Sequence, residues 1–170
     1  AVSHFRAAGV VHGHGTTSVV DEAAFIILET LHLPVDDINP WLDARLLKPE
    51  RAALARIITA RVKTRKPAAY LLKKTYMHGV PFYVDERVII PRSYIGELLV
   101  NGLVDAEGNS LAGDGGPARV LDLCTGSGCL AILAAGLFPE AVIDATDLSK
   151  DALAVARINV DKHHMADRIT

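Results

Sequence analysis

Apolar residues recur at helical spacing over the first part of the chain. Ser18, with Asp21 three positions later, is typical of a helix N-cap and precedes an apolar run over 23–31. Pro49 suits the first turn of a second helix, which Pro67 is expected to end. The pattern predicts a small bundle of amphipathic helices joined by proline-containing turns.

The period then changes to that of strands. Residues 76–84 and 87–91, with Asp85-Glu86 between them, predict a β-hairpin with an acidic turn. A short helix is expected over 95–104. The stretch 105–117 contains four glycines among polar residues, which is typical of a flexible linker.

Strands and helices alternate over the remaining residues. Apolar strands are predicted at 118–123 and 141–146, with helices over 130–137 and after Ser149. This order predicts an open α/β fold with a parallel sheet and right-handed crossovers. Residues 168–170 resemble the start of a further strand, and the chain lacks an initial Met. Because two strands do not make a stable sheet, we expect an incomplete sheet and a fragment of a longer protein.

The composition limits the class of protein. Half of the 170 residues are hydrophobic and the formal net charge is −2, which excludes low-complexity disorder and collagen-like repeats. Apolar runs are shorter than the ~20 residues of a membrane-spanning helix, and no secretory signal pattern is present. Two cysteines do not make a disulfide framework. These features predict a reduced, cytoplasmic protein without a membrane partner.

Positive charge is concentrated in one segment. Residues 45–74 contain ten basic residues and one acid, Glu50, which gives a formal charge of +9. Such a segment suits phosphate groups or an acidic protein, although a solvated helix face explains it equally well. Tyr70 is its one aromatic residue, so base stacking and sequence-specific readout are not expected. Electrostatic docking onto a ribonucleoprotein stays open.

The candidate chemistry lies at the turn after the first parallel strand. Asp122 lies at the strand end, and Cys124-Thr125-Gly126-Ser127-Gly128 leads into the following helix. Glycines at this position let a ligand approach the backbone, and the helix N-terminus suits a carboxylate or a phosphate. The second strand ends at Asp147, whose carboxylate can accept hydrogen bonds from both hydroxyls of a ribose. Together these features predict an adenosine-containing cofactor.

Two cofactors fit this pattern. Residues 126–131 match the dinucleotide fingerprint G-x-G-x-x-[GA], so an NAD-dependent oxidoreductase stays open. An acid at Asp122 and the lack of a third glycine favour S-adenosylmethionine, because an acid can serve the ammonium group of its methionine portion. A plain tight turn would leave Asp122 and Asp147 unexplained. No Gly-Lys-Ser/Thr follows the loop, which excludes a Walker-type phosphate site.

Two motifs resemble those of a known family. Asp-Leu-Cys-Thr-Gly-Ser-Gly-Cys at 122–129 and Phe-Tyr-Val-Asp-Glu-Arg-Val-Ile-Ile-Pro-Arg-Ser at 82–93 resemble the glutamine-amide methyltransferases that modify translation proteins. Gly-His-Gly-Thr at 13–16 and Trp-Leu-Asp-Ala-Arg at 41–45 extend the resemblance over essentially the whole chain. The chain resembles more closely the branch that acts on a large-subunit ribosomal protein, because it has Cys at 124, where the release-factor branch usually has Gly.

The resemblance implies a domain organisation and a site. It implies a helical substrate-recognition domain over 1–75, a β-hairpin linker over 76–92 and the N-terminal part of a Rossmann-like S-adenosylmethionine-dependent methyltransferase domain over 93–170. The implied cofactor site consists of Asp122, Cys124, Thr125, Gly126, Ser127, Gly128 and Asp147, with Pro91 and Arg92 at the substrate-site rim and no metal. Tyr94 departs from the proline expected there.

The resemblance also implies a reaction. It is methyl transfer to the side-chain amide of a glutamine in a large-subunit ribosomal protein. The contact with ribosomal RNA is a separate expectation, which rests on the positive charge of residues 45–74. The family's Asn-Pro-Pro-Tyr motif, which holds the glutamine, is not in this sequence. We therefore expect no catalytic residue in this chain and no activity of the chain alone. A release-factor glutamine methyltransferase and a non-catalytic ribosome-binding module are the alternatives.

Other reactive side chains are expected to be structural. Cys124 and Cys129 fit no usual zinc spacing and are interpreted as small buried residues. The histidine pairs at 12 and 14 and at 163 and 164 are expected in solvated loops. Trp41 is expected to be a core anchor.

Overall fold

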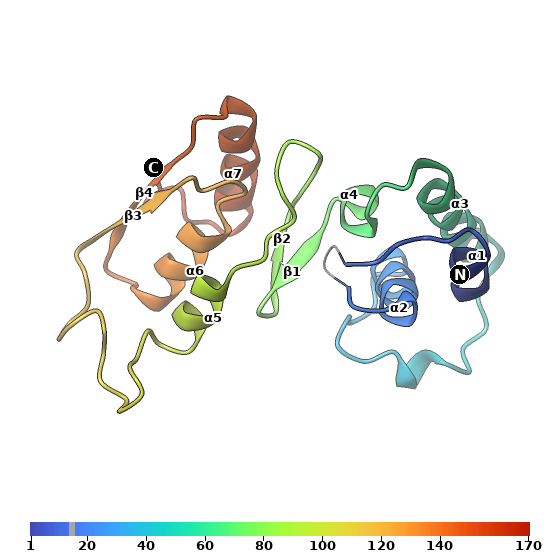
Figure 1. The fold of residues 1–170 in the computed structure, drawn as a ribbon, viewed down its shortest axis with the longest axis horizontal. Helices are drawn as coiled ribbons and strands as arrows, with labels where there is room; N and C mark the ends of the chain where they lie inside the picture. Colours follow the sequence, from blue (N-terminus) through green and yellow to red (C-terminus); the bar gives the residue numbers. More distant parts are fainter. Residues whose placement is uncertain (14–15) are drawn as a thin grey trace. The chain divides into compact units, whose positions relative to one another are not determined.

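The computed structural model describes residues 1–13 and 16–170, so His14 and Gly15 of the Gly-His-Gly-Thr motif lie outside the described residues. The chain divides into two compact units, residues 1–73 and 74–170, and each is described by itself (Figure 1). This division is close to the predicted boundary at residue 75, but a separate role for the hairpin as a linker domain stays a prediction. Among the described residues, no helix combines the length and the apolar character that crossing a membrane requires.

The first unit is a bundle of short helices. Its elements are α1 (Val2–Ala7), α2 (Val19–Thr30), the 3-10 turn η1 (Asn39–Trp41), α3 (Lys48–Thr64) and α4 (Ala68–Leu72). The side chain of Ser18 accepts a hydrogen bond from the Asp21 backbone N–H and caps α2, as predicted. Pro49 lies in the first turn of α3, also as predicted. The helical character of this part of the chain is therefore confirmed.

A buried ion pair crosses the apolar core of the first unit. Glu22 and Arg61 are both buried, and Arg61 Nε donates to Glu22 Oε1 at 2.7 Å. Arg61 Nη2 also donates to the Val11 carbonyl at 2.8 Å, and the His12 ring forms a hydrogen bond with Glu22. Buried charges need such partners because their desolvation is costly. The network therefore fastens α2, α3 and the segment before α2 to one another.

Trp41 is not a core residue. The residue is 39% exposed, and it belongs to neither apolar core cluster. It ends η1, and every residue from 41 to 49 is exposed. The expectation of a core anchor was wrong because the short 3-10 turn directs this segment along the surface of the unit.

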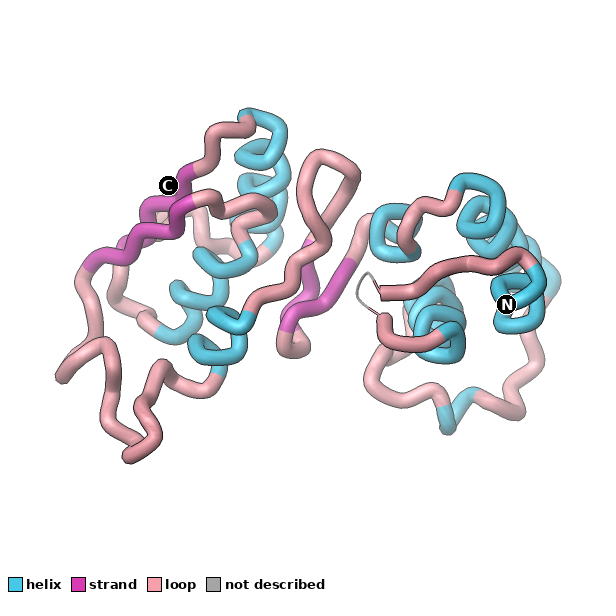
Figure 2. The backbone as a smooth tube through the Cα atoms, viewed as in Figure 1, coloured by secondary structure: helices cyan, strands magenta, loops and turns pink. Residues whose placement is uncertain are grey.

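The second unit combines a hairpin, a parallel strand pair and three helices among the residues that the structure describes (Figure 2). Its elements are β1 (Thr75–Met77), β2 (Val80–Phe82), α5 (Tyr94–Val100), β3 (Arg119–Leu123), α6 (Cys129–Leu137), β4 (Val142–Thr146) and α7 (Lys150–Lys162). β3 pairs with β4 in parallel, with Val120 opposite Ile143. Ser149 caps α7. The predicted order of strands and helices in this part of the chain is confirmed.

The hairpin is shorter than predicted and turns earlier. β1 pairs antiparallel with β2, and the chain reverses at His78-Gly79, where both φ angles are positive (51° and 80°). Positive φ at both central residues is the requirement of a type I′ hairpin turn. Residues 87–91 form no strand, and Asp85-Glu86 belongs to the loop over 83–93. The acidic hairpin turn was therefore a wrong prediction, and the missed signal was the His-Gly pair.

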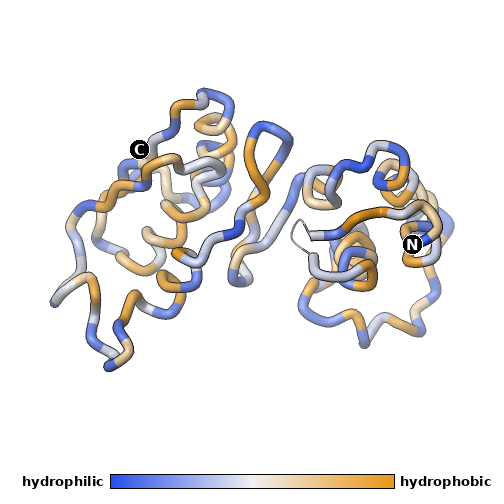
Figure 3. The backbone as a smooth tube through the Cα atoms, in the orientation of Figure 1, coloured by the Kyte–Doolittle hydropathy of each residue, from blue (hydrophilic) through white to orange (hydrophobic). Residues whose placement is uncertain are grey.

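Helices cover one face of the β3–β4 pair. Ile143 is fully buried and packs with Val120 and Ala145 against α6, which is almost entirely apolar (Figure 3). On the opposite face, Leu121 and Leu123 are exposed. Among the residues that the structure describes, the predicted buried strand is thus covered on one side and exposed on the other.

Ile169 and Thr170 pair in parallel with β4. Ile169 forms a parallel bridge with Ile143, and Thr170 N donates to the Ile143 carbonyl at 2.9 Å. Ala145 N donates to the Thr170 carbonyl at 2.8 Å. These residues pair with β4 on the edge that β3 leaves free. The bridge agrees with the predicted start of a strand at 168–170, and the predicted incomplete α/β sheet is confirmed.

Candidate functional site

A pocket of about 480 Å³ lies at the carboxyl end of β3. Its walls are the 87–93 part of the loop, the 124–127 part of the glycine loop, the start of α6, and Asp147 with residues of the first turn of α7. Most of the predicted site residues are thereby brought together: Pro91, Arg92, Cys124, Thr125, Gly126, Ser127 and Asp147. Asp122 and Gly128 do not line it. Ligands of open α/β proteins bind at this edge of the sheet.

Hydrogen bonds fasten the glycine loop to the end of β4. Thr125 N donates to the Thr146 carbonyl at 2.9 Å, and Gly126 N donates to Asp147 Oδ2 at 2.9 Å. The other carboxylate oxygen of Asp147 accepts from Ser149 N at 2.9 Å. Each carboxylate oxygen has two acceptor sites, so Asp147 can still accept bonds from a ligand. The side chain is thus held in place at the pocket wall without being saturated.

Asp122 does not line the pocket, but its hydrogen bonds hold the glycine loop. Its Oδ2 accepts from Thr125 Oγ1 at 2.6 Å and from Ala131 N at 3.1 Å. These bonds connect the end of β3, the loop and the first turn of α6. The visible role of Asp122 is therefore to shape the loop, and its predicted contact with a cofactor ammonium group stays a prediction.

The two loop glycines are required for different reasons. Gly126 and Gly128 have φ angles of 56° and 78°, which are unfavourable for other residues. A Cβ at Gly128 would lie 3.2 Å from Ala156 Cβ and 3.3 Å from Ala156 Cα, whereas one at Gly126 would meet nothing closer than 4.0 Å. Gly128 therefore also permits the close packing of α6 on α7.

We expect Gly128→Ala to destabilise the chain more than Gly126→Ala. Gly126→Ala carries only the conformational cost of about 1–2 kcal/mol, whereas Gly128→Ala adds an overpacking cost of about 1–3 kcal/mol. Urea unfolding of both variants measures the difference. Equal losses would mean that the contact with Ala156 does not limit this position.

Asn159 on α7 is a site-supporting residue that the sequence analysis missed. It is fully buried, and its Oδ1 accepts from Tyr83 N at 2.6 Å. Its Nδ2 donates to the Tyr83 carbonyl at 2.9 Å and to the Ser127 carbonyl at 2.8 Å. One amide thus connects the 83–93 loop with the glycine loop. The available signal was a polar residue on the apolar face of α7 that contains Val155 and Ala156.

A second polar cluster fixes the same loop. The Arg87 side chain donates to both carboxylate oxygens of Asp85, at 2.9 Å for Nε–Oδ1 and 2.6 Å for Nη2–Oδ2. Tyr83 Oη donates to Asp85 Oδ2 at 2.8 Å. The bonds from Arg87 hold the pKa of Asp85 well below its usual range. Asp85 therefore has a structural role, as predicted. The turn that it shapes lies within the 83–93 loop and is not a hairpin turn.

This pKa shift predicts an acid-sensitive loop. Because the folded-state pKa lies below the unfolded value of about 3.9, the stabilisation is present at neutral pH and is lost as the pH falls below about 4. We expect Asp85→Asn to show a smaller fall in its urea midpoint between pH 5 and pH 3 than the unmodified chain. An identical fall in both proteins would contradict this role of Asp85.

The cysteines differ in environment. Cys129 is buried, and burial raises the pKa of its thiol, as suits a small buried residue. Cys124 is exposed and lines the pocket with a φ of 59°, so the prediction of burial was wrong there. The cause is the turn itself, which directs the backbone of Cys124 away from the core.

Two of the histidines have hydrogen-bond partners. The His12 ring bonds to Glu22, and His163 Nε2 lies 2.8 Å from the Pro81 carbonyl oxygen. The expectation of a solvated loop was therefore wrong for His12, whose side chain is 16% exposed and bonded to Glu22. His163 lies partly exposed in the turn after α7, as expected, and the expectation for His14 falls outside the described residues. Within the described ranges, no group of three or more metal-ligating side chains occurs.

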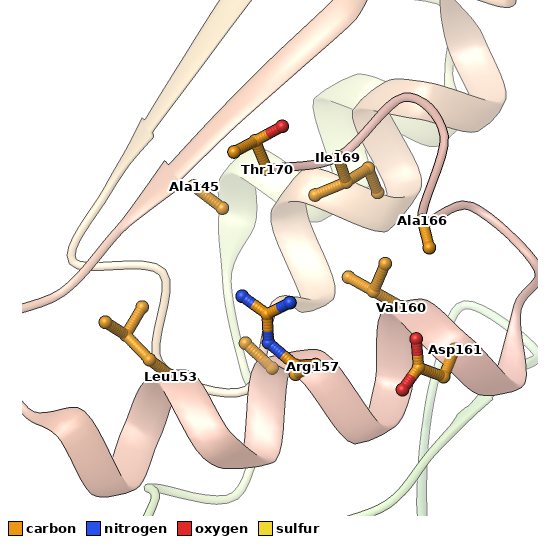
Figure 4. A pocket seen from close by; sticks show the side chains of 9 residues that line it. Ala145, Leu153, Arg157, Val160, Asp161, Ala166, Ile169 and Thr170 are labelled. Atoms are coloured by element: carbon orange, nitrogen blue, oxygen red, sulfur yellow. The ribbon is translucent and has the colours of Figure 1, made fainter.

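A smaller cavity of about 280 Å³ lies between β4, α7 and the last residues of the chain (Figure 4). Its lining is mainly small and apolar, with Arg157 and Asp161 as the charged side chains. It contains none of the predicted site residues. The pocket beside Asp147 is therefore the candidate site.

Comparison with known proteins places the chain in a family. Residues 98–170 match the family model described as "Methyltransferase small domain". The chain is 54% identical over 170 residues to the "Ribosomal protein uL3 glutamine methyltransferase" of Burkholderia pseudomallei, covering 99% of this chain and 54% of that protein. The chain belongs to this methyltransferase family. The same name is carried by a Bradyrhizobium diazoefficiens protein, 54% identical over 172 residues, and by a Bordetella pertussis protein, 49% identical over 170 residues.

The similarity extends beyond the methyltransferase domain. It covers 100% of this chain and 54% of the Bradyrhizobium protein, and 100% of this chain and 56% of the Bordetella protein. The chain thus spans about half the length of the curated relatives that it matches. The resemblance drawn from residues 82–93 and 122–129 is confirmed, and so is the Rossmann-like methyltransferase fold in incomplete form.

Proposed function

We propose that the whole protein transfers a methyl group from S-adenosylmethionine to the side-chain amide nitrogen of a glutamine in the ribosomal protein uL3. The observation that carries the proposal is the glycine loop held against Asp147, in a chain that is 54% identical to a uL3 glutamine methyltransferase over 99% of its length. The name of this relative also favours the ribosomal-protein branch of the family over the release-factor branch. Such a substrate is met in the cytoplasm, where we propose that the protein acts.

The residues around the pocket suit S-adenosylmethionine. A volume of about 480 Å³ is within the range of roughly 300–1,000 Å³ for small-ligand sites. We propose that Asp147 accepts hydrogen bonds from the ribose hydroxyls and that the backbone of 124–128 contacts the methionine portion. Leu148, next to Asp147, is fully exposed and offers an apolar surface for the adenine. When bound, the cofactor would supply an electrophilic methyl group on a sulfonium: its S–CH3 bond would break as the N–CH3 bond forms, leaving S-adenosylhomocysteine, and the amide nitrogen would lose one proton to solvent.

The protein's contribution to such a reaction is alignment. An amide nitrogen is a poor nucleophile because its lone pair is delocalised into the carbonyl. Holding it in line with the methyl group, in a site from which water is excluded, supplies much of the acceleration. Pro91 and Arg92 lie on the pocket wall formed by the 83–93 loop, where we propose that the glutamine enters.

Methyl transfer to uL3 tests this proposal. The full-length protein, S-adenosylmethionine and purified uL3 are incubated, and the peptides of uL3 are analysed by mass spectrometry. We expect one glutamine-containing peptide to gain the mass of a single methyl group, with NAD unable to replace the cofactor. An unmodified uL3 under conditions where the protein binds S-adenosylmethionine would overturn the assigned substrate.

The outer face of α3 favours an accompanying contact with ribosomal RNA. Lys48, Arg51, Arg56 and Lys63 are exposed, and within the described residues none of the four forms an ion pair. We propose that they contact RNA phosphates without reading sequence, because such binding needs only clustered cations. A filter-binding affinity for ribosomal RNA that falls steeply with salt is the expected result, and salt-independent binding would contradict it.

A further inference from the structure

A second cavity adjoins the proposed cofactor pocket. Its volume is about 520 Å³, and it shares three lining residues with that pocket, Pro91, Arg92 and Ser93. Its remaining walls come from the hairpin turn and from α5: Met77, His78, Tyr94 and Glu97. Both cavities lie within the second unit. A chain segment whose one side chain occupies the first pocket can therefore place a neighbouring side chain in the second.

The cavity wall is built by close packing. A Cβ at Gly96 would lie 3.0 Å from Met77 Sδ and 3.3 Å from His78 Nε2. The hairpin turn therefore packs directly against α5 at this glycine. This contact fixes the distance between the two walls, so the cavity is a defined feature of the fold.

The side chains around the cavity are those of a binding surface. Tyr94 is 88% exposed, although it carries a large apolar ring. Tyrosine and arginine are enriched among the residues that dominate binding energy at interfaces. Among the described residues, Glu97 forms no ion pair. Arg92 lines both pockets, whereas Glu97 lines the second cavity and not the first, so the part of the second cavity that is not shared carries a carboxylate.

We propose that this cavity is a subsite for the substrate polypeptide and binds a lysine or arginine side chain located a few residues from the methylated glutamine. Glu97 is the carboxylate partner of that cation, and Tyr94 packs against its aliphatic stem. The inference rests on the proposed function, since the glutamine must occupy the first pocket. A protein that binds ribosomal RNA carries basic side chains for its phosphates, so the charge of Glu97 is complementary to such a substrate.

Peptides with one variable position test the subsite. The probes are alanine nonapeptides with a central glutamine, in which a single lysine or a single glutamate is placed at each other position in turn. Methyl transfer by the full-length protein gives kcat/KM, and fluorescence anisotropy gives binding independently of the reaction. We expect lysine at one or two flanking positions to be favoured over glutamate by at least tenfold in both measurements.

Charge variants identify the residue responsible. Glu97→Gln is expected to reduce the preference for lysine to less than threefold, and Glu97→Lys to reverse it in favour of glutamate. Glu107→Gln, which neutralises an exposed acid in the 101–117 loop, is the matched control and is expected to retain the preference.

The outcomes separate this inference from the proposed function. If the protein methylates the peptides and prefers lysine, but Glu97→Lys leaves that preference unchanged, the subsite is overturned and the proposed function stands. A Glu97-dependent preference in binding, without methyl transfer to peptides or to uL3, would support the subsite and overturn the function. An absence of any positional preference in binding would overturn the subsite whatever the activity.

Discussion

Replacing Asp147 by alanine is expected to weaken the binding of S-adenosylmethionine by roughly ten- to a hundredfold. Each hydrogen bond from a ribose hydroxyl to a carboxylate contributes about 1.5 kcal/mol or more, and every 1.4 kcal/mol is a factor of ten in affinity. Asp147 is held at the pocket wall by bonds from Gly126 N and Ser149 N, each 2.9 Å long, so it is already oriented before the ligand arrives. Isothermal titration calorimetry measures the change.

The same bonds require a control, because Asp147→Ala also removes a brace of the glycine loop. S-adenosylhomocysteine and an analogue that lacks both ribose hydroxyls distinguish the two effects. The unmodified protein should prefer the natural compound, and Asp147→Ala should bind the two equally. Asp167→Ala, an exposed acid in the same unit, should leave the preference intact. A preference that survives in Asp147→Ala would show that this residue does not contact the ribose.

Features that depend on neighbouring residues could be predicted from the sequence. The caps at Ser18 and Ser149 are made with backbone groups three positions away, so the pattern of side chains is sufficient to locate the start of each helix. The approach of the glycine loop to Asp147 was also predictable. Parallel strands end at one edge of the sheet, and Leu123 on β3 lies opposite Thr146 on β4.

Features that depend on distant contacts were not predictable. Asn159 bonds to Tyr83, 76 positions earlier, and to Ser127, 32 positions earlier, and no local pattern records such pairs. The outward position of Trp41 likewise depends on how its unit packs. The hydrogen bonds of Asp122 to Thr125 and Ala131 were not predicted either, since these partners are brought to the carboxylate only once the loop is folded.

The contacts of Asn159 predict a large loss of stability. Asn159→Leu preserves the approximate size of the side chain but leaves the Tyr83 N–H, the Tyr83 carbonyl and the Ser127 carbonyl without their partner. Each unsatisfied buried group costs about 1–3 kcal/mol, so we expect a total loss of about 3 kcal/mol or more in the free energy of unfolding. Urea denaturation followed by circular dichroism measures it.

A local consequence accompanies the global one, because Asn159 connects the 83–93 loop to the rest of the second unit. When this bond is lost, the loop is expected to open, and trypsin should cleave after Arg87 or Arg92 faster than in the unmodified chain. Asn101→Leu, at an exposed position after α5, is the control and should change stability by less than about 0.5 kcal/mol. If Asn159→Leu were as stable as the unmodified chain, with unchanged cleavage and cofactor affinity, the loop would be held by the Asp85–Arg87 cluster and hairpin packing alone.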